Sequence, residues 1–395
     1  MATKPTLKEE ERFGQASFVF ENDTVEVSVT EVGGMTAPVV FTLPDGRGVS
    51  PYYVNPWHGE ARELDEPVLV PLRGDFFCLP FGASNDMEGE SYGVHGESAG
   101  KRWTPGALGE SGGVTSFAMT MDYAATKGTV TKELTLRAGE QALYIEHSLA
   151  GFSGAYPLGH HATLAGSVHT GELAISVKPF DLGLTSPVFP WFQADGEYYS
   201  LQPDQGFTAL ESVPTVWKDE PTTDCSVFPN RKGFVDIMAT YRKSAADAAP
   251  EDRLAWTCAV NRNQGWIWFS LKDASVLPAT VFWMENHGRH QPPWDGRNCC
   301  IGLEEVCGFF ANGRVDSVGK NRVSEAGIPT AVNLSADRMT RVRAIHGMVP
   351  APKGFEKVTD LVPKKGAIEL RDGSGKSVEV SVGWEFLFDG ADALL

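Results

Sequence analysis

The chain has 395 residues, of which 22% are charged and 10% are aromatic, a composition typical of a folded globular protein with a large core. Its formal net charge of −17, without a cluster of Lys and Arg, argues against a nucleic-acid partner. The first residues lack the apolar stretch of a signal peptide, and no apolar run is long enough to span a bilayer. We therefore expect a cytoplasmic protein.

Alternating apolar and polar residues recur along the chain, and this period of two is typical of half-buried β-strands. In chain order, such runs lie at residues 25–29, 117–123, 134–136, 143–145, 173–177 and 266–268, and the longest covers residues 378–388. Turn signals lie at residues 44–46, 312–313 and 372–373. Because no strand–helix–strand alternation is present, the sequence predicts an all-β chain of antiparallel hairpins and meanders.

The domain organisation follows from the absence of a low-complexity linker. One domain over residues 1–395 is the simplest interpretation, since all-β architectures often run long without dividing. We expect its core at about residues 14–348 and a C-terminal β-hairpin extension at residues 353–389.

Three short polar clusters interrupt the strand-like sequence. They are residues 92–97 with His95, residues 159–163 with His160 and His161, and residues 302–305 with Glu304 and Glu305. Histidine titrates near neutral pH, and a partly desolvated glutamate can be raised toward it. If the fold brings the clusters together, they can supply one proton while removing another.

Two other chemistries use the same kinds of residue. Residues 96–100 and 109–113 match the G-x-S-x-G pattern of serine hydrolases, but neither has the strand before it and the helix after it that the serine elbow needs. A metal site would use His95, His160, His161 and Glu304. That interpretation is weakened because adjacent residues on a strand, such as His160 and His161, point to opposite faces.

A third segment looks like a binding surface. Residues 285–297 are dense in hydrogen-bonding and aromatic side chains, and residues 56–60 offer Trp57 and His58 in the same way. Sugars need this mixture of aromatic faces and planar polar groups. A solvated loop is the alternative interpretation.

Four segments, taken in order, resemble the motifs of the aldose 1-epimerase, or galactose mutarotase-like, superfamily. They are residues 73–82, from Arg73 to Gly82, then 94–96, 159–164 and 302–304. The resemblance covers roughly residues 14–348 and is to bacterial members of the superfamily. It implies a large antiparallel β-sandwich with a sugar-sized groove across one sheet, and interconversion of sugar anomers without a metal or cofactor.

The resemblance also implies roles for particular residues. Glu304 takes the proton of the anomeric hydroxyl and His161 donates one to the ring oxygen, while His95 and Arg73 hold sugar hydroxyls. The further candidates for contact with the sugar are Phe76, Trp103 and Trp294 by stacking and Asp236 or Asp295 as the binding aspartate. A phosphate or carboxylate on the sugar would need basic residues, for which the candidates are Arg73, Lys101, Arg102, Arg289 and Arg297.

The second histidine motif departs from the family pattern. His160 stands where an asparagine is usual, and Ala162 follows His161 where an aromatic residue is usual. We choose His161 over His160 because the strand that follows it aligns best. Two alternatives stay open: a sugar-binding protein without turnover, and another sugar isomerase or lyase on the same fold.

Overall fold

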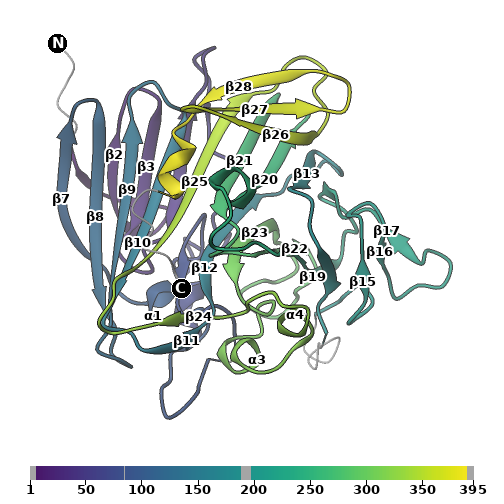
Figure 1. The fold of residues 1–395 in the computed structure, drawn as a ribbon, viewed down its shortest axis with the longest axis horizontal. Helices are drawn as coiled ribbons and strands as arrows, with labels where there is room; N and C mark the ends of the chain where they lie inside the picture. The colour runs from purple at the N-terminus through teal and green to yellow at the C-terminus, as the bar shows by residue number, and fades with distance from the viewer. Residues whose placement is uncertain (1–5, 84, 188–196, 389–395) are drawn as a thin grey trace.

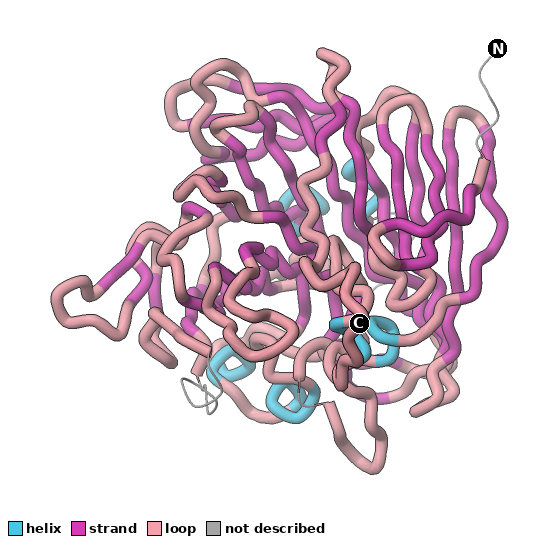
Figure 2. The backbone as a smooth tube through the Cα atoms, turned by 180° about the vertical axis from the view of Figure 1, so that it is seen from behind, coloured by secondary structure: helices cyan, strands magenta, loops and turns pink. Residues whose placement is uncertain are grey.

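Strands account for most of the regular structure in this protein (Figures 1 and 2). The structure, a computed structural model, describes residues 6–83, 85–187 and 197–388. All pairs of neighbouring strands in its sheets are antiparallel, so the predicted all-β class and antiparallel sandwich are confirmed. Within these residues, no helix is both long and apolar enough to cross a membrane.

The largest sheet has nine strands. In spatial order they are β18 (Val227–Phe228), β13 (Leu173–Val177), β20 (Leu254–Asn261), β21 (Trp266–Asp273), β25 (Thr340–Pro350), β10 (Ala142–Ala150), β9 (Thr129–Arg137), β8 (Val114–Asp122) and β7 (Thr104–Ser111). Five of the runs predicted from alternation fall within this sheet, at residues 117–123, 134–136, 143–145, 173–177 and 266–268. Strands β8 and β9 bury alternate residues because only one of their faces lies on the core, whereas β20 and β21 are buried at every residue.

A seven-stranded sheet carries the polar clusters. Its strands, in spatial order, are β15 (Gly206–Phe207), β14 (Leu182–Thr185), β19 (Phe234–Tyr241), β22 (Ala279–Asn286), β23 (Cys299–Cys307), β12 (Leu158–Ala165) and β6 (Phe77–Cys78). Strands β22 and β23 are almost entirely buried. Both faces of this sheet are therefore covered, one by the core and the other by loops and short helices.

A five-stranded sheet at the N-terminal end completes the main core. It consists of β1 (Lys8–Arg12), β2 (Gln15–Glu21), β3 (Val25–Thr30), β4 (Thr36–Thr42) and β5 (Gly48–Val49). Val27 of this sheet, Phe117 of the nine-stranded sheet and Leu303 of the seven-stranded sheet belong to one apolar cluster. This shared burial holds the three sheets together.

The C-terminal segment (yellow in Figure 1) covers the other face of the nine-stranded sheet over β20, β21, β25 and β10. It forms three strands, β26 (Val358–Lys364), β27 (Ala367–Asp372) and β28 (Ser377–Ser381). The prediction of a hairpin at residues 353–389 therefore falls one strand short, and residue 389 lies outside the described part of the chain. Ile368 and Val380 pack here against Trp256 and Phe269.

The predicted strand at residues 378–388 is wrong in its second half. Strand β28 ends at Ser381, and Trp384–Leu387 forms the 3₁₀ helix η2. The chain leaves the sheet because the Trp384 indole donates to the carbonyl of Lys364 at 2.7 Å, and the Gly383 amide donates to the hydroxyl of Tyr144 at 2.7 Å. Trp384 and Leu387 are the buried residues of this turn, and their spacing of three fits a 3₁₀ helix rather than the alternation of a strand.

The remaining elements are short. The helices are η1 (Pro67–Leu69), α1 (Glu97–Gly100), α2 (Pro250–Arg253), α3 (Arg314–Val318) and α4 (Arg322–Glu325), and two small ribbons pair β11 (Gly154–Tyr156) with β24 (Val332–Leu334) and β16 (Val213–Pro214) with β17 (Thr222–Thr223). The single-domain interpretation stays a prediction.

Candidate active site

His161 and Glu304 meet across two neighbouring strands. Strands β12 and β23 are antiparallel, and their register places His161 directly opposite Glu304. Residues that face each other in this way put their side chains on the same face of the sheet. His161 Nε2 lies 3.2 Å from Glu304 Oε1, so the two functional groups are in direct polar contact.

The sequence around this pair leaves room for it. Gly302 stands two residues before Glu304 on β23, on the same face, and a Cβ atom there would lie 2.5 Å from Glu304 Oε1. On the other strand, Thr163 Oγ1 lies 3.1 Å from His161 Nδ1. Phe76 stacks on the imidazole of His161, with ring centroids 4.5 Å apart and an interplanar angle of 17°. The orientation of His161 is thus fixed from two sides.

Burial determines the protonation of the pair. Glu304 has 1% of its surface exposed and His161 has 4%. Loss of solvation raises the pKa of the Glu304 carboxyl well above its ordinary value and lowers the pKa of His161 to about 4. At neutral pH the favoured form is therefore uncharged, a carboxylic acid beside a neutral imidazole. Glu304 Oε2 has no hydrogen-bond partner among the described residues.

His95 lies beside this pair. Its ring centroid is 5.0 Å from that of His161, in an edge-to-face arrangement. The amide of Gly82 donates to His95 Nδ1 at 3.3 Å, so the second ring nitrogen, Nε2, carries the proton of the neutral ring. Burial holds the pKa of His95 well below its ordinary value, and the nearby His161 and Arg289 add to the effect. His95 is therefore a neutral hydrogen-bond donor.

These three residues line a cavity of about 410 Å³. Its walls include the aromatic rings of Phe76, Trp283 and Trp294, together with aliphatic side chains from η1 and β22. Cavities of ~300–1,000 Å³ with mostly apolar walls and a few convergent polar groups are typical small-molecule sites. A buried acid–base pair in such a cavity is the arrangement expected of an active site.

Comparison with solved structures identifies the fold. The structure is similar to a galactose mutarotase-like protein from Clostridium acetobutylicum, with a TM-score of 0.58 and 11% identity over 87% of this chain and 98% of that chain. It has the galactose mutarotase-like fold. A galactose mutarotase related enzyme from Lactobacillus acidophilus gives a TM-score of 0.52 and 10% identity over 84% and 97% of the two chains.

A third similar structure is a galactose mutarotase-like protein from Lactobacillus casei, with a TM-score of 0.51 and 13% identity over 84% of this chain and 99% of that chain. No protein-family model matches the chain, and no curated protein sequence does. At sequence identities of 10% to 13%, the similarity to these structures shows a shared fold.

Five of the predicted site residues line the cavity of this mutarotase-like fold: Glu304, His161, His95, Phe76 and Trp294. Arg73 and Trp103 do not. The Arg73 guanidinium donates to the backbone carbonyls of residues 12, 13 and 71 at 2.8 to 3.0 Å, and the Trp103 indole donates to the carbonyl of Ser98 at 3.0 Å. Both side chains are fully buried and hold loops together.

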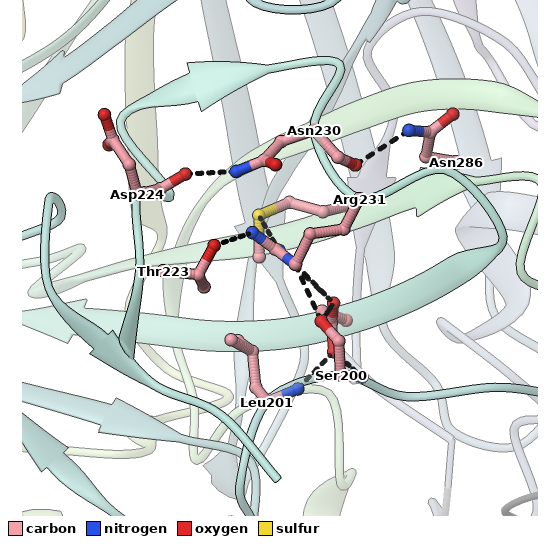
Figure 3. Close-up of polar contacts among 9 residues, drawn as sticks. Ser200, Leu201, Thr223, Asp224, Asn230, Arg231 and Asn286 are labelled. Atoms are coloured by element: carbon pink, nitrogen blue, oxygen red, sulfur yellow. Dashed lines mark hydrogen bonds and ion pairs between the residues drawn. The ribbon is translucent and has the colours of Figure 1, made fainter. Parts of the chain in front are cut away.

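Asp236 also lies away from the cavity. It is on β19, and the next residue, Ile237, is the one that lines the cavity, because successive side chains alternate between faces. The Asp236 carboxylate accepts hydrogen bonds from the amides of residues 200 and 201 and pairs with Arg231 at 3.2 Å. Figure 3 shows this network around Arg231 and Ser200.

Asp295 and Arg297 lie on the loop that carries Trp294, but not on the cavity wall. Asp295 pairs with Arg62 at 3.2 Å and with Arg297 at 3.4 Å, and Arg297 also pairs with Glu60. All four side chains are about one-third exposed. The polar density of residues 285–297 is thus partly a surface ion-pair network.

Sequence reasoning missed several contributors to the cavity wall, among them Trp283, Ile237 and Leu72, and considered Arg289 only as a candidate contact for a charged substituent. Trp283 and Ile237 lie in strands and Leu72 in a loop, and the sequence does not reveal which side of a strand faces a cavity. Arg289 pairs through Nε with Glu197 at 2.9 Å and lies 4.9 Å from the centre of the Trp294 ring.

The serines of the two G-x-S-x-G matches, and His160 of the metal-site interpretation, do not line the cavity. Ser98, in the first G-x-S-x-G match, is buried and donates to the carbonyl of Phe77 at 2.7 Å, while Ser111 is exposed at the end of β7. His160 points away from His161 and lies 3.2 Å from Asp75 through Nδ1. In the described ranges of the chain, no group of three or more His, Cys, Asp or Glu side chains is arranged to hold a metal ion.

Proposed function

We propose that the protein interconverts the anomers of a reducing sugar, with His161 and Glu304 as a coupled proton-exchange pair. One observation carries this proposal: a buried carboxyl and a buried imidazole touch at 3.2 Å in a cavity, and one carboxyl oxygen has no partner among the described residues. The mutarotase-like fold of the similar structures supports it.

The chemistry needs two proton transfers around one carbon. The hydroxyl O1 and the ring oxygen O5 are both bonded to C1, so an acid and a base in mutual contact can reach both atoms. O5 gains a proton, O1 loses one, the C1–O5 bond breaks, and C1–O1 becomes a carbonyl. Rotation about C1–C2 followed by reclosure on the other face of C1 reverses both transfers and gives the other anomer.

Burial favours a starting form with a protonated Glu304 and a neutral His161. In that form Glu304 donates to O5 and His161 Nε2 accepts from O1, whereas the family resemblance implies the opposite assignment. Transfer of one proton across the 3.2 Å contact converts one form into the other. We therefore assign the chemistry to the pair, which titrates as a unit.

Other cavity residues would position the sugar. His95 Nε2–H is a donor for a sugar hydroxyl, since Nδ1 is occupied by the amide of Gly82. Trp283 and Trp294 offer ring faces to the C–H edges of the sugar. The proposal includes the cytoplasmic location that the sequence predicts, and it involves no metal or cofactor.

The test is the rate at which fresh α-D-glucose and α-D-galactose change optical rotation, measured with and without the protein. Glu304→Gln and His161→Ala should each lower the catalysed rate by ~10²–10⁴-fold, because each removes one of the two proton transfers. Asp295→Asn is the matched control, since this exposed side chain lies off the cavity wall and should leave the rate unchanged.

Unchanged rates in both cavity variants would overturn the assignment. If no sugar is turned over but sugars raise the melting temperature of the wild type and not of Glu304→Gln, the protein is a binding module that uses the same cavity.

A further inference from the structure

The cavity has a continuous aromatic and aliphatic side. Trp283 packs edge-on against His161 at 5.9 Å between ring centroids, and against Trp294 at 5.7 Å. Trp294 in turn contacts Trp57 at 5.0 Å, and the Trp57 indole donates to the carbonyl of Leu69 at 2.8 Å. Apolar surface therefore runs from the acid–base pair to η1, where Val68 and Leu69 also line the cavity. We call this surface the apolar wall.

The polar lining residues fall into two sets, His95, His161 and Glu304 in one, and Ser186, Asn312, Arg289 and Asp316 in the other. Of the described lining residues, His95, His161 and Glu304 cluster at one place, and burial favours the neutral form of each. On β19 the cavity is faced by Ile237, while the neighbouring carboxylate, Asp236, is used by Arg231. Hydroxyls of a sugar that face the apolar wall would be left without partners, which is unfavourable.

The charged lining residues do not compensate. Arg289 is ion-paired with Glu197 at 2.9 Å, so its charge is largely neutralised. Asp316, on the first turn of α3, is exposed and accepts from Asn312 Nδ2 at 2.8 Å, which leaves a negative charge at the cavity. A phosphate or carboxylate on the ligand would meet a cation that is already ion-paired and the negative charge of Asp316.

We propose that the ligand is an uncharged reducing sugar that carries an apolar substituent away from C1, with the substituent lying on the apolar wall. This inference rests on the proposed function for its reducing sugar. The acid–base pair engages O1 and O5, and the substituent follows Trp283 and Trp294 toward Leu69. A single pyranose ring fills only part of a cavity of about 410 Å³, and the substituent fills the rest.

Isothermal titration with a matched series of sugars tests this proposal. The probes are D-glucose, 6-deoxy-D-glucose, 6-O-hexyl-D-glucose and D-glucose 6-phosphate. Each methylene buried on an apolar surface improves affinity by about fourfold, so the hexyl ether should bind at least tenfold more tightly than glucose. Glucose 6-phosphate should bind more weakly than glucose.

Two variants test whether the apolar wall causes the tighter binding of the hexyl ether. Leu69→Ser should lower the ratio of hexyl-ether affinity to glucose affinity, because it makes the wall polar. Ile237→Asp should lower the same ratio by adding a carboxylate that accepts from sugar hydroxyls. Val168→Ser, at a site that is 93% exposed and off the cavity wall, is the control and should leave the ratio unchanged.

The proposal is overturned if glucose or glucose 6-phosphate binds as tightly as the hexyl ether, or if the ratio is the same in Leu69→Ser, Ile237→Asp and the wild type. Its failure is distinct from that of the proposed function. If the protein catalyses mutarotation of glucose but binds the ether no more tightly, only the apolar substituent is rejected. If the ether binds more tightly but no probe is mutarotated, only the enzymatic activity is rejected.

Discussion

Two histidine–glutamate pairs lie side by side on β12 and β23, one on each face of the sheet. In the register of these strands, His160 is opposite Glu305 and His161 is opposite Glu304. The residue types are identical and all four side chains are buried. The two pairs nevertheless differ in their neighbours.

On the core side, both oxygens of Glu305 have partners, and His160 has one through Nδ1. Glu305 accepts from the hydroxyls of Thr257 at 2.6 Å and Thr280 at 2.9 Å and pairs with Lys272. His160 turns to Asp75 rather than to Glu305. On the cavity side, the Glu304 carboxyl contacts His161 alone among the described side chains that bear ionisable groups. Glu304 and His161 line a cavity that a ligand can enter, whereas His160 and Glu305 do not. Chemistry is expected where a buried polar group without a partner faces a cavity, and the same residue types are structural where none reaches them.

The largest expected effect is on the free energy of unfolding, which should respond differently to substitution of Glu305 and of Glu304. Glu305→Gln leaves the buried Lys272 ammonium without its carboxylate and should lower the free energy of unfolding by about 3–5 kcal/mol. Glu304→Gln replaces an uncharged carboxylic acid by an uncharged amide and should change it by less than about 1 kcal/mol. Urea unfolding of both variants and the wild type measures the difference, and equal losses in the two variants would remove the contrast between the two faces.

The second effect concerns Gly302, which makes room for the Glu304 carboxyl. Gly302→Ala places a Cβ 2.5 Å from Glu304 Oε1, which is too close, so the carboxyl must move and its contact with His161 changes. Because a misplacement of about 1 Å at a reacting group can cost about 100-fold, we expect that loss in the mutarotation rate. Retention of the wild-type rate in a folded Gly302→Ala protein would contradict the importance of the contact. Gly373→Ala, in an open turn of the C-terminal sheet, is the control.

The third effect is on acid stability and concerns the core side. Burial lowers the pKa of His147 well below its ordinary value and that of His346 to about 4. Unfolding therefore takes up protons below about pH 6.5, and stability falls as the pH is lowered through this window toward the folded pKa values. His147→Phe, a ring that can keep the stack on Phe77, should make the decline shallower by up to about 1.4 kcal/mol per pH unit. Melting temperatures measured from pH 7 to pH 4.5 test this, and an identical slope in the variant would refute it.

The smallest effect concerns the partner of His161 Nδ1. Thr163→Val keeps the size of the side chain and removes the hydroxyl at 3.1 Å. The loss of one hydrogen bond, about 0.5–1.5 kcal/mol, should lower the mutarotation rate by about threefold to tenfold through the orientation of His161. Thr163→Ser, which retains the hydroxyl, should recover most of the rate, and a failure to do so would point to packing rather than to the hydrogen bond.

The sequence by itself determined the class of the fold and the two strands of the site. Alternation of apolar residues is a local property, and it predicted most strands correctly. It failed at residues 384–387, where apolar residues alternate in the sequence but the buried ones, Trp384 and Leu387, stand three apart in a 3₁₀ helix. Local alternation also established that His160 and His161 point to opposite faces.

Only the tertiary structure decided which face is the cavity. That choice depends on distant segments: η1, the loop with Trp294, and α3 cover one face of the seven-stranded sheet, while the nine-stranded sheet covers the other. For the same reason, Arg73, Trp103, Asp236, Asp295 and Arg297 could not be placed from sequence. Their polar groups satisfy partners elsewhere in the fold, and such partners are set by long-range contacts that no local pattern encodes.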